Sequence, residues 1–239
     1  MIIIPARIGS SRFPSKVLAD ILGVPMVIRT AQAVAPLDAV TIATDSVEVL
    51  ELAEEYGIRA VMTSTEHQSG TDRIFEAATI LELPDDEIII NVQADEPFIE
   101  EEVVEKVYQL TRQNASDPSI LACSAYKIVS NPEADDPNLV KVVTDDHDIA
   151  LYFSRAKIPY PRDHHFDTYK GHLGLYGYTM ASLKTFCELE PAKLEEVEKL
   201  EQLRILAHGY RVAMVKVETE SFGIDMPEDL QKVMKKHLL

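Results

Sequence analysis

Apolar and polar stretches in the first hundred residues predict four strands separated by helices. Residues 2–4 and 87–92 are continuous and largely β-branched, which is typical of strands buried on both faces of a parallel sheet. Between them the pattern predicts strands at 39–43 and 59–62, and helices at 25–34, at 47–56 and in a stretch ending at Leu83. This alternation indicates right-handed crossovers, and hence an α/β fold whose mainly parallel sheet carries helices on both faces.

The pattern loosens beyond residue 100. It predicts helices at 100–112, 194–207 and 226–238, strands at 120–128, 172–180 and 212–217, and an antiparallel pair at 140–143 and 150–153. In the helix at 194–207, Val197, Leu200, Leu203 and Ile205 are expected to share one face. Because no long linker interrupts the chain, we predict one domain over residues 1–239, with a core at about 1–125 and 205–239 and a smaller mixed lobe at about 126–204.

A basic loop is predicted directly after the first strand, where Pro5 is expected to end the strand. The loop, residues 5–16, carries Arg7, Arg12 and Lys16 together with Gly9. Arginine forks and a lysine ammonium bind phosphate oxygens, and a glycine lets the backbone approach them. The loop therefore suits a polyphosphate, although an ordinary basic surface loop is the alternative.

The overall charge makes this loop more informative. The 239 residues carry a formal net charge of −17 at pH 7, which argues against nucleic acid and against an anionic membrane surface as partners. Cations gathered in one loop of an acidic protein indicate a small anionic ligand. The N-terminal apolar run is too short for a targeting segment or a membrane span, so we expect no membrane insertion and a cytoplasmic location.

Two aspartates occupy positions suited to a metal ion. Asp95 follows the strand at 87–92, and Asp225 precedes the last predicted helix. Ligands of doubly wound sheets bind at the carboxyl ends of the strands, and Mg²⁺ is commonly held there by one or two carboxylates plus substrate phosphates. The alternative is that each aspartate only caps the helix that follows it.

Seven runs, in order along the chain, resemble the CMP-Kdo synthetases, the 3-deoxy-manno-octulosonate cytidylyltransferase family. They are the basic loop and the runs at 67–73, 91–97, 150–155, 171–178, 200–204 and 223–230. The resemblance implies a Rossmann-like nucleotidyltransferase fold with a smaller dimerisation lobe, acting as a homodimer. It also implies transfer of CMP from CTP to the anomeric hydroxyl of the sugar acid Kdo, with release of pyrophosphate, Mg²⁺ as cofactor and a role in lipopolysaccharide biosynthesis.

The resemblance also implies roles for individual residues. Those expected to act in catalysis are Lys16, Asp95 and Asp225, of which Asp95 and Asp225 would bind magnesium. Those expected to bind the nucleotide form two groups. The triphosphate would be held by Arg7, Arg12 and Lys16, with Arg73 as a further candidate, and the cytosine and neighbouring atoms would be met by Ala6, Gln68, Ser69 and Gly70. Those expected to bind the sugar are Gln93, Arg155, Arg162, His172, Tyr176, Glu201 and Gln202. No dedicated general base is assigned, because a metal-associated hydroxyl can lose its proton without one.

Other interpretations remain open. Without the resemblance, Arg155 and Arg162 would be surface ion pairs, His172 a core histidine, and Glu201 with Gln202 a solvated helix face. Ser15 and Ala94 stand where the family usually has glycine, which can alter how closely the backbone approaches a ligand. The acceptor could be 8-amino-Kdo or another nonulosonic acid. A protein of another class, a nucleotide-binding regulatory subunit without activity, would share the same motifs.

Overall fold

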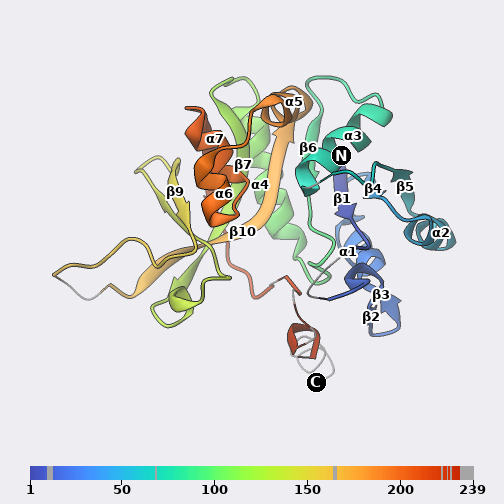
Figure 1. Ribbon diagram of the computed structural model, residues 1–239, viewed down its shortest axis with the longest axis horizontal. Helices are drawn as coiled ribbons and strands as arrows, with labels where there is room; N and C mark the ends of the chain where they lie inside the picture. The colour runs from blue at the N-terminus through green and yellow to red at the C-terminus, as the bar shows by residue number, and fades with distance from the viewer. Residues whose placement is uncertain are drawn as a thin grey trace. The chain divides into compact units, whose positions relative to one another are not determined.

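The computed structural model describes residues 1–9, 13–67, 69–163, 166–221, 223–224, 226 and 228–231 (Figure 1). The chain divides into two compact units. Met1–Glu105 and Glu220–Leu239 form the first unit, and Lys106–Thr219 form the second. The predicted division into a core and a lobe at other boundaries stays a prediction. In the described part of the chain, no helix is both long and apolar enough to span a membrane.

The first unit is built on four parallel strands. They are β1 (Ile2–Ala6), β4 (Val40–Thr44), β5 (Arg59–Met62) and β6 (Ile88–Asn91), in the spatial order β6-β1-β4-β5. α1 (Met26–Val34), α2 (Val47–Glu55) and α3 (Gly70–Ile80) connect them. Right-handed crossovers place α1 and α2 on one face and α3 on the other, because the chain reverses direction across the sheet after β5. The predicted alternation is confirmed, and the strand order reverses between β1 and β6.

Pro5 does not end the first strand, contrary to the prediction. It lies inside β1, paired with Ala43 of β4. Ile3 faces β6, because its carbonyl accepts from the Val92 N–H, and Pro5 faces the same side. The pairing of β6 with β1 ends at Asn91, opposite Ile3. The missing N–H of Pro5 therefore points where no ladder bond is needed.

A short hairpin that the sequence pattern did not predict follows the basic loop. η1 (Lys16–Leu18) leads into β2 (Asp20–Ile21) and β3 (Val24–Pro25). The turn between the two strands uses Leu22 and Gly23, both at positive φ, as a two-residue hairpin turn requires. Ile21 of β2 is buried with Met26 and with Ile224, so the late part of the chain contributes to the core of the first unit.

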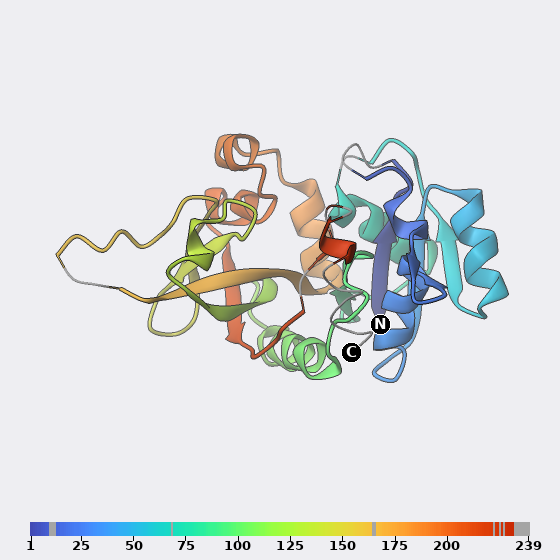
Figure 2. The same cartoon turned by 90° about the horizontal axis from the view of Figure 1, so that it is seen from below.

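The second unit contains a mixed sheet (Figure 2). β7 (Ile120–Ser130) pairs antiparallel with the long β10 (Thr168–Thr179), drawn in orange, and parallel with β11 (Arg211–Lys216). β8 (Lys141–Thr144) pairs antiparallel with β9 (Ala150–Ser154), as predicted, and also with β10. The other elements of this unit are η2 (Glu133–Asp135), α5 (Met180–Glu188), α6 (Lys193–Glu198) and α7 (Gln202–Ala207). α4 (Glu101–Asn114) begins in the first unit and belongs to the second from Lys106 onward.

The single helix predicted at 194–207 is wrong, because the chain breaks it at Lys199. Lys199 adopts the left-handed region at φ 54°, which ends α6 before α7 begins. The Arg204 guanidinium then binds the Glu195 carboxylate across the break, at 2.8 Å and 2.5 Å. Val197, expected on the apolar face, is 72% exposed, whereas Leu200, Leu203 and Ile205 are buried as predicted.

Candidate active site

Lys16 and Asp95 meet in the first unit although 79 residues separate them. Lys16 begins η1 after β1, and Asp95 follows β6, so both lie beyond the carboxyl ends of the two strands where the strand order reverses. The Lys16 ammonium lies 2.6 Å from Asp95 Oδ2. The pair places a cation and an anion at the position where a doubly wound sheet binds its ligand.

The segment that contains Asp225 runs beside Asp95. Asp225 itself lies outside the described residues, but the Ile224 N–H donates to the Asp95 carbonyl at 2.9 Å. A Cβ on Gly223 would come 3.4 Å from Glu96 Oε1 and 3.8 Å from Asp95 Oδ1. The two segments predicted to supply the metal carboxylates are therefore neighbours in the first unit.

The residues around Asp95 fit a magnesium ion that is shared with a nucleotide. The described residues contain no group of three or more His, Cys, Asp or Glu that could enclose a metal. Magnesium commonly takes one or two carboxylates and completes its octahedron with phosphate oxygens and water. The Asp95 carboxylate is a hard oxygen ligand that remains 25% exposed and already faces a cation. Its role as a metal ligand stays a prediction.

The predicted triphosphate residues are placed only in part. Arg7 is exposed and directly follows Ala6, a predicted cytosine residue that is buried at the end of β1. Arg12 lies outside the described residues. The backbone of the loop is fixed near its start, because the Ile8 N–H donates to Asp45 Oδ1 at 3.3 Å.

The residues predicted to meet the cytosine surround the start of α3. Ser69 caps the helix, since its Oγ accepts the Asp72 N–H at 3.0 Å and donates to Asp72 Oδ2 at 2.8 Å. Gly70 packs closely on β1, where a Cβ would lie 3.3 Å from Pro5 Cγ. The same Cβ would lie 3.8 Å from Gln93 Oε1, a predicted sugar contact. Gln68 lies outside the described residues.

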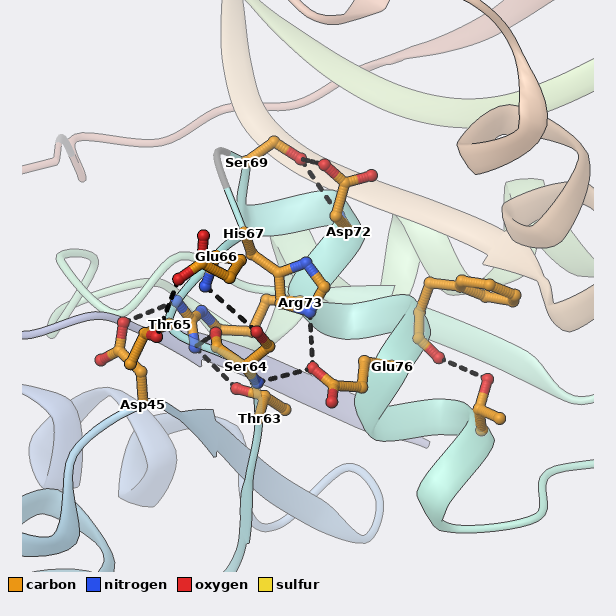
Figure 3. A network of polar contacts seen from close by, with 12 residues as sticks. Asp45, Thr63, Ser64, Thr65, Glu66, His67, Ser69, Asp72, Arg73 and Glu76 are labelled. Atoms are coloured by element: carbon orange, nitrogen blue, oxygen red, sulfur yellow. Dashed lines mark hydrogen bonds and ion pairs between the residues drawn. The ribbon is translucent and has the colours of Figure 1, made fainter.

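Arg73 has a different environment from an exposed phosphate-binding arginine. Its side chain is only 3% exposed, and its guanidinium contacts Asp45 at 2.7 Å and Thr63 Oγ1 at 2.6 Å (Figure 3). Asp45 and Ser46 both precede α2, and either residue type can cap a helix. Ser46 fills that role by accepting the Val49 N–H, which leaves the Asp45 carboxylate available to Arg73.

His172 is a neutral histidine of the second unit. Burial lowers its pKa to about 3, and its ring packs edge-on to Phe153. Its Nε2 lies 3.0 Å from Ser124 Oγ, which also lies 2.8 Å from the Leu175 carbonyl and 3.2 Å from the Leu173 carbonyl. Because carbonyls can only accept, the single hydroxyl proton is best used toward one of them. Nε2 therefore donates to Ser124, and Nδ1 is left as an acceptor. At neutral pH the ring can accept from a sugar hydroxyl but brings no charge to a sugar carboxylate.

Tyr176, Glu201 and Gln202 lie in the same unit as His172. The Tyr176 ring centroid lies 5.5 Å from that of His172. Burial and the neighbouring Glu201 carboxylate both raise the pKa of Tyr176, so its hydroxyl stays protonated. Gln202 is buried at the start of α7, although a solvated face was its alternative interpretation. Six of the seven predicted sugar residues, all except Gln93, thus belong to the second unit, and two of them, His172 and Gln202, are buried.

The two predicted sugar-binding arginines differ from each other. Arg155 donates to the carbonyls of Glu198 at 2.8 Å, Pro137 at 3.1 Å and Lys199 at 3.4 Å, and so ties β9 to the end of α6. Arg162 is exposed and pairs with Asp163 at 3.5 Å. The structure does not bring the two arginines together with a common described partner, and their contact with a sugar stays a prediction.

These features define an α/β protein that carries a nucleotide-type site at the reversal of its sheet. A family model described as cytidylyltransferase matches residues 1–217, and the chain belongs to that family. Relatives named 3-deoxy-manno-octulosonate cytidylyltransferase from a Nitratiruptor species and from Wolinella succinogenes are 58% and 53% identical, and each alignment covers 98% of both proteins. The family resemblance inferred from the seven runs is confirmed.

Solved structures agree with the fold. A structure of CMP:2-keto-3-deoxy-manno-octonic acid synthetase complexed with CTP matches with a TM-score of 0.91 at 38% identity, covering 99% of this chain and 97% of that one. A cytidylyltransferase from Leptospira borgpetersenii matches with a TM-score of 0.58 at 14% identity, which shows the fold alone. The predicted Rossmann-like nucleotidyltransferase fold is confirmed.

Proposed function

We propose that this protein transfers CMP from CTP to the anomeric hydroxyl of Kdo and releases pyrophosphate. The observation that carries the proposal is the Lys16–Asp95 pair beyond β1 and β6, at the ligand-binding position of the sheet. The names of the relatives and the CTP complex of the structural neighbour support the substrates. The wider role that we propose is lipopolysaccharide biosynthesis by a cytoplasmic homodimer.

The chemistry asks mainly for positioning and charge neutralisation. The sugar hydroxyl attacks the α-phosphorus of CTP, and the bond to the bridging oxygen of pyrophosphate breaks with the electron pair leaving on pyrophosphate. Arg7, Arg12 and Lys16 hold the triphosphate and offset the negative charge that grows on the leaving group. The Lys16 ammonium exchanges its contact with Asp95 for phosphate oxygens as CTP binds.

Asp95 and Asp225 are the residues proposed to hold Mg²⁺. When bound, the ion polarises the α-phosphate and lowers the pKa of a hydroxyl near it. The backbone of Asp95 follows β6 closely along the chain, and its carbonyl accepts the Ile224 N–H. Asp95 thus has a fixed backbone from which to present its carboxylate.

The acceptor is proposed to contact side chains that each supply a defined hydrogen bond. His172 Nδ1 accepts from a hydroxyl of the sugar, and the protonated Tyr176 hydroxyl donates. Glu201, Gln202 and Gln93 complete the polar set. The sugar carboxylate calls for a permanent cation, which Arg155 or Arg162 supplies, because His172 is neutral.

Pyrophosphate release tests the proposal. Wild-type protein with CTP, Mg²⁺ and Kdo is expected to release pyrophosphate, and Asp95→Asn is expected to lower kcat at least about 100-fold while remaining folded. Asp86→Asn, the same change at an exposed carboxylate, is the matched control and should retain full turnover. Asp225→Asn is expected to behave like Asp95→Asn.

A panel of acceptors and metals separates the alternatives. Turnover of 8-amino-Kdo or another nonulosonic acid in place of Kdo would reject Kdo as the acceptor. Binding of CTP without product from any sugar acid would indicate a regulatory subunit. Unchanged turnover after chelation of divalent ions, together with near-normal Asp95→Asn and Asp225→Asn, would reject the metal role.

A further inference from the structure

The Asp45 carboxylate links two loops of the first unit that are predicted to bind the nucleotide. It follows β4, and its Oδ1 accepts the Ile8 N–H of the basic loop at 3.3 Å. Its Oδ2 accepts from the Arg73 guanidinium of α3 at 2.7 Å. Both side chains are largely buried, at 13% exposure for Asp45 and 3% for Arg73. One carboxylate therefore fixes the backbone after β1 and a cation on the helix after β5.

Arg73 extends the link to the segment that follows β5. Its Nη1 donates to Thr63 Oγ1 at 2.6 Å and to the Ser64 carbonyl at 3.3 Å. Thr63 in turn donates through its N–H and Oγ1 to the Thr44 carbonyl, at 2.8 Å and 3.0 Å, just before Asp45. The residues that follow β4 and β5 are therefore hydrogen-bonded to each other and to the same Arg73 guanidinium.

A second tie holds the same segment one turn further along α3. The Glu76 carboxylate accepts the Ser64 N–H at 2.8 Å and contacts His67 Nε2 at 2.5 Å (Figure 3). Glu76 and Arg73 are three residues apart and so lie on one face of the helix. The segment 63–67 is thus fixed to α3 immediately before Ser69 and Gly70, which are proposed to meet the cytosine.

We propose that Asp45 and Arg73 are a positioning pair, which fixes the basic loop relative to the segment that leads from β5 to Ser69 and Gly70. In this role Arg73 does not contact the triphosphate. The Arg73 side chain is 3% exposed, and a phosphate that took the place of Asp45 at Nη2 would leave a buried carboxylate without its cation. The Thr63 and Ser64 oxygens occupy further donors of the same guanidinium. This inference rests on the proposed function, since it assumes that the protein binds CTP.

Binding of CTP, CDP and CMP to wild type, Arg73→Lys and Asp45→Asn, measured by calorimetry, tests the pair. For a positioning pair, both variants are expected to weaken all three nucleotides by a similar factor, about 10- to 100-fold, because the base pocket is displaced whatever the phosphate number. Arg73→Lys should not rescue binding, since an ammonium cannot make the same fork of bonds.

A direct phosphate contact by Arg73 predicts the opposite pattern. The loss in Arg73→Lys would then grow from CMP to CTP, and Asp45→Asn would tighten CTP by releasing the guanidinium; either result would overturn the inference. Arg7→Met provides the reference for a phosphate contact, because this variant is expected to lose more affinity for CTP than for CDP or CMP. Wild-type protein that binds none of the three nucleotides would instead overturn the proposed function, and this inference with it.

Glu195→Gln is the matched control for the loss of a buried arginine–carboxylate pair. Glu195 pairs with Arg204 in the second unit, with similarly low exposure of 12% and 10%. The variant is expected to lower thermal stability as much as Asp45→Asn does, while all three nucleotide affinities stay at the wild-type values. If Glu195→Gln weakened the nucleotides as much as Asp45→Asn, the effect of Asp45→Asn would be one of stability and the positioning role would be rejected.

Discussion

Ser15 has a backbone conformation that a side chain disfavours. Its φ is 52°, in the left-handed region, directly before Lys16. This gives a physical reason for the glycine that the family usually carries there, because only glycine adopts this region without a steric cost. Ala94, the other departure, is not in the left-handed region, and its carbonyl accepts from Thr30 at 2.9 Å. Of the two departures from the family pattern, only Ser15 therefore carries a backbone strain that glycine would avoid.

Ser15→Gly is expected to raise the free energy of unfolding by up to about 1 kcal/mol, because the relief of the left-handed strain exceeds the extra entropy of the unfolded glycine. Urea denaturation measures the change. Ser116→Gly, in an exposed turn with ordinary φ, is the matched control and should lose stability instead. Equal losses in both variants would contradict the strain at Ser15.

His172 is expected to make stability depend on pH. Its folded pKa of about 3 lies below its ordinary value of 6.5, so the unfolded chain binds a proton that the folded protein excludes. The stability that comes from keeping His172 neutral is fully present above pH 6.5 and is lost as the pH falls toward 3. At pH 5 the loss of unfolding free energy amounts to about 2 kcal/mol. The difference in unfolding free energy between pH 7 and pH 5 should be smaller by that amount in His172→Gln. An unchanged difference would show that His172 titrates normally in the folded protein.

At the scale of elements, the close approach of β10 to its neighbours requires a glycine. Gly171 lies opposite Lys127 of β7, and an added Cβ would lie 2.9 Å from Val129 Cγ1 and 3.2 Å from Leu139 Cδ1. Gly171→Ala is expected to cost about 1 to 3 kcal/mol of unfolding free energy, since the packed neighbours must shift. Thermal and urea denaturation measure it.

Gly9→Ala is the control for this substitution, because its added methyl group meets no heavy atom within 4 Å among the described residues. It should leave stability nearly unchanged. A Gly171→Ala protein as stable as Gly9→Ala would show that Val129 and Leu139 move aside at little cost.

Elements with a clear apolar period could be predicted from the sequence. Elements that depend on a residue with positive φ could not. The strands of the first unit follow from their continuous apolar runs, and β8 with β9 from the turn between them. The break at Lys199 and the turn at Leu22 use positive φ in residues that carry no such signal. Pro5 misled the prediction because a proline is tolerated wherever the neighbouring strand has already ended.

For the whole molecule, the sequence predicted which residue types gather at the site better than what each one binds. Lys16 and Asp95 were each predicted to follow a strand at its carboxyl end, but the ion pair between them was not predicted. The partners of Arg73 and Arg155 could not be predicted, because an arginine in a motif looks the same whether it faces a ligand or a buried carbonyl. Which of Asp45 and Ser46 caps α2 could not be predicted either, because Asp and Ser both cap helices and only the fold shows which one does.

The discontinuous make-up of the first unit bears on the order in which the protein is made. Ile224 completes the apolar cluster with Ile21 and Met26, and its N–H holds the carbonyl of Asp95. During synthesis Ile224 follows all of Lys106–Thr219, whereas Ile21, Met26 and Asp95 precede that stretch. A nascent chain that has not yet reached residue 224 therefore lacks both the apolar contact with Ile21 and Met26 and the backbone bond to the Asp95 carbonyl.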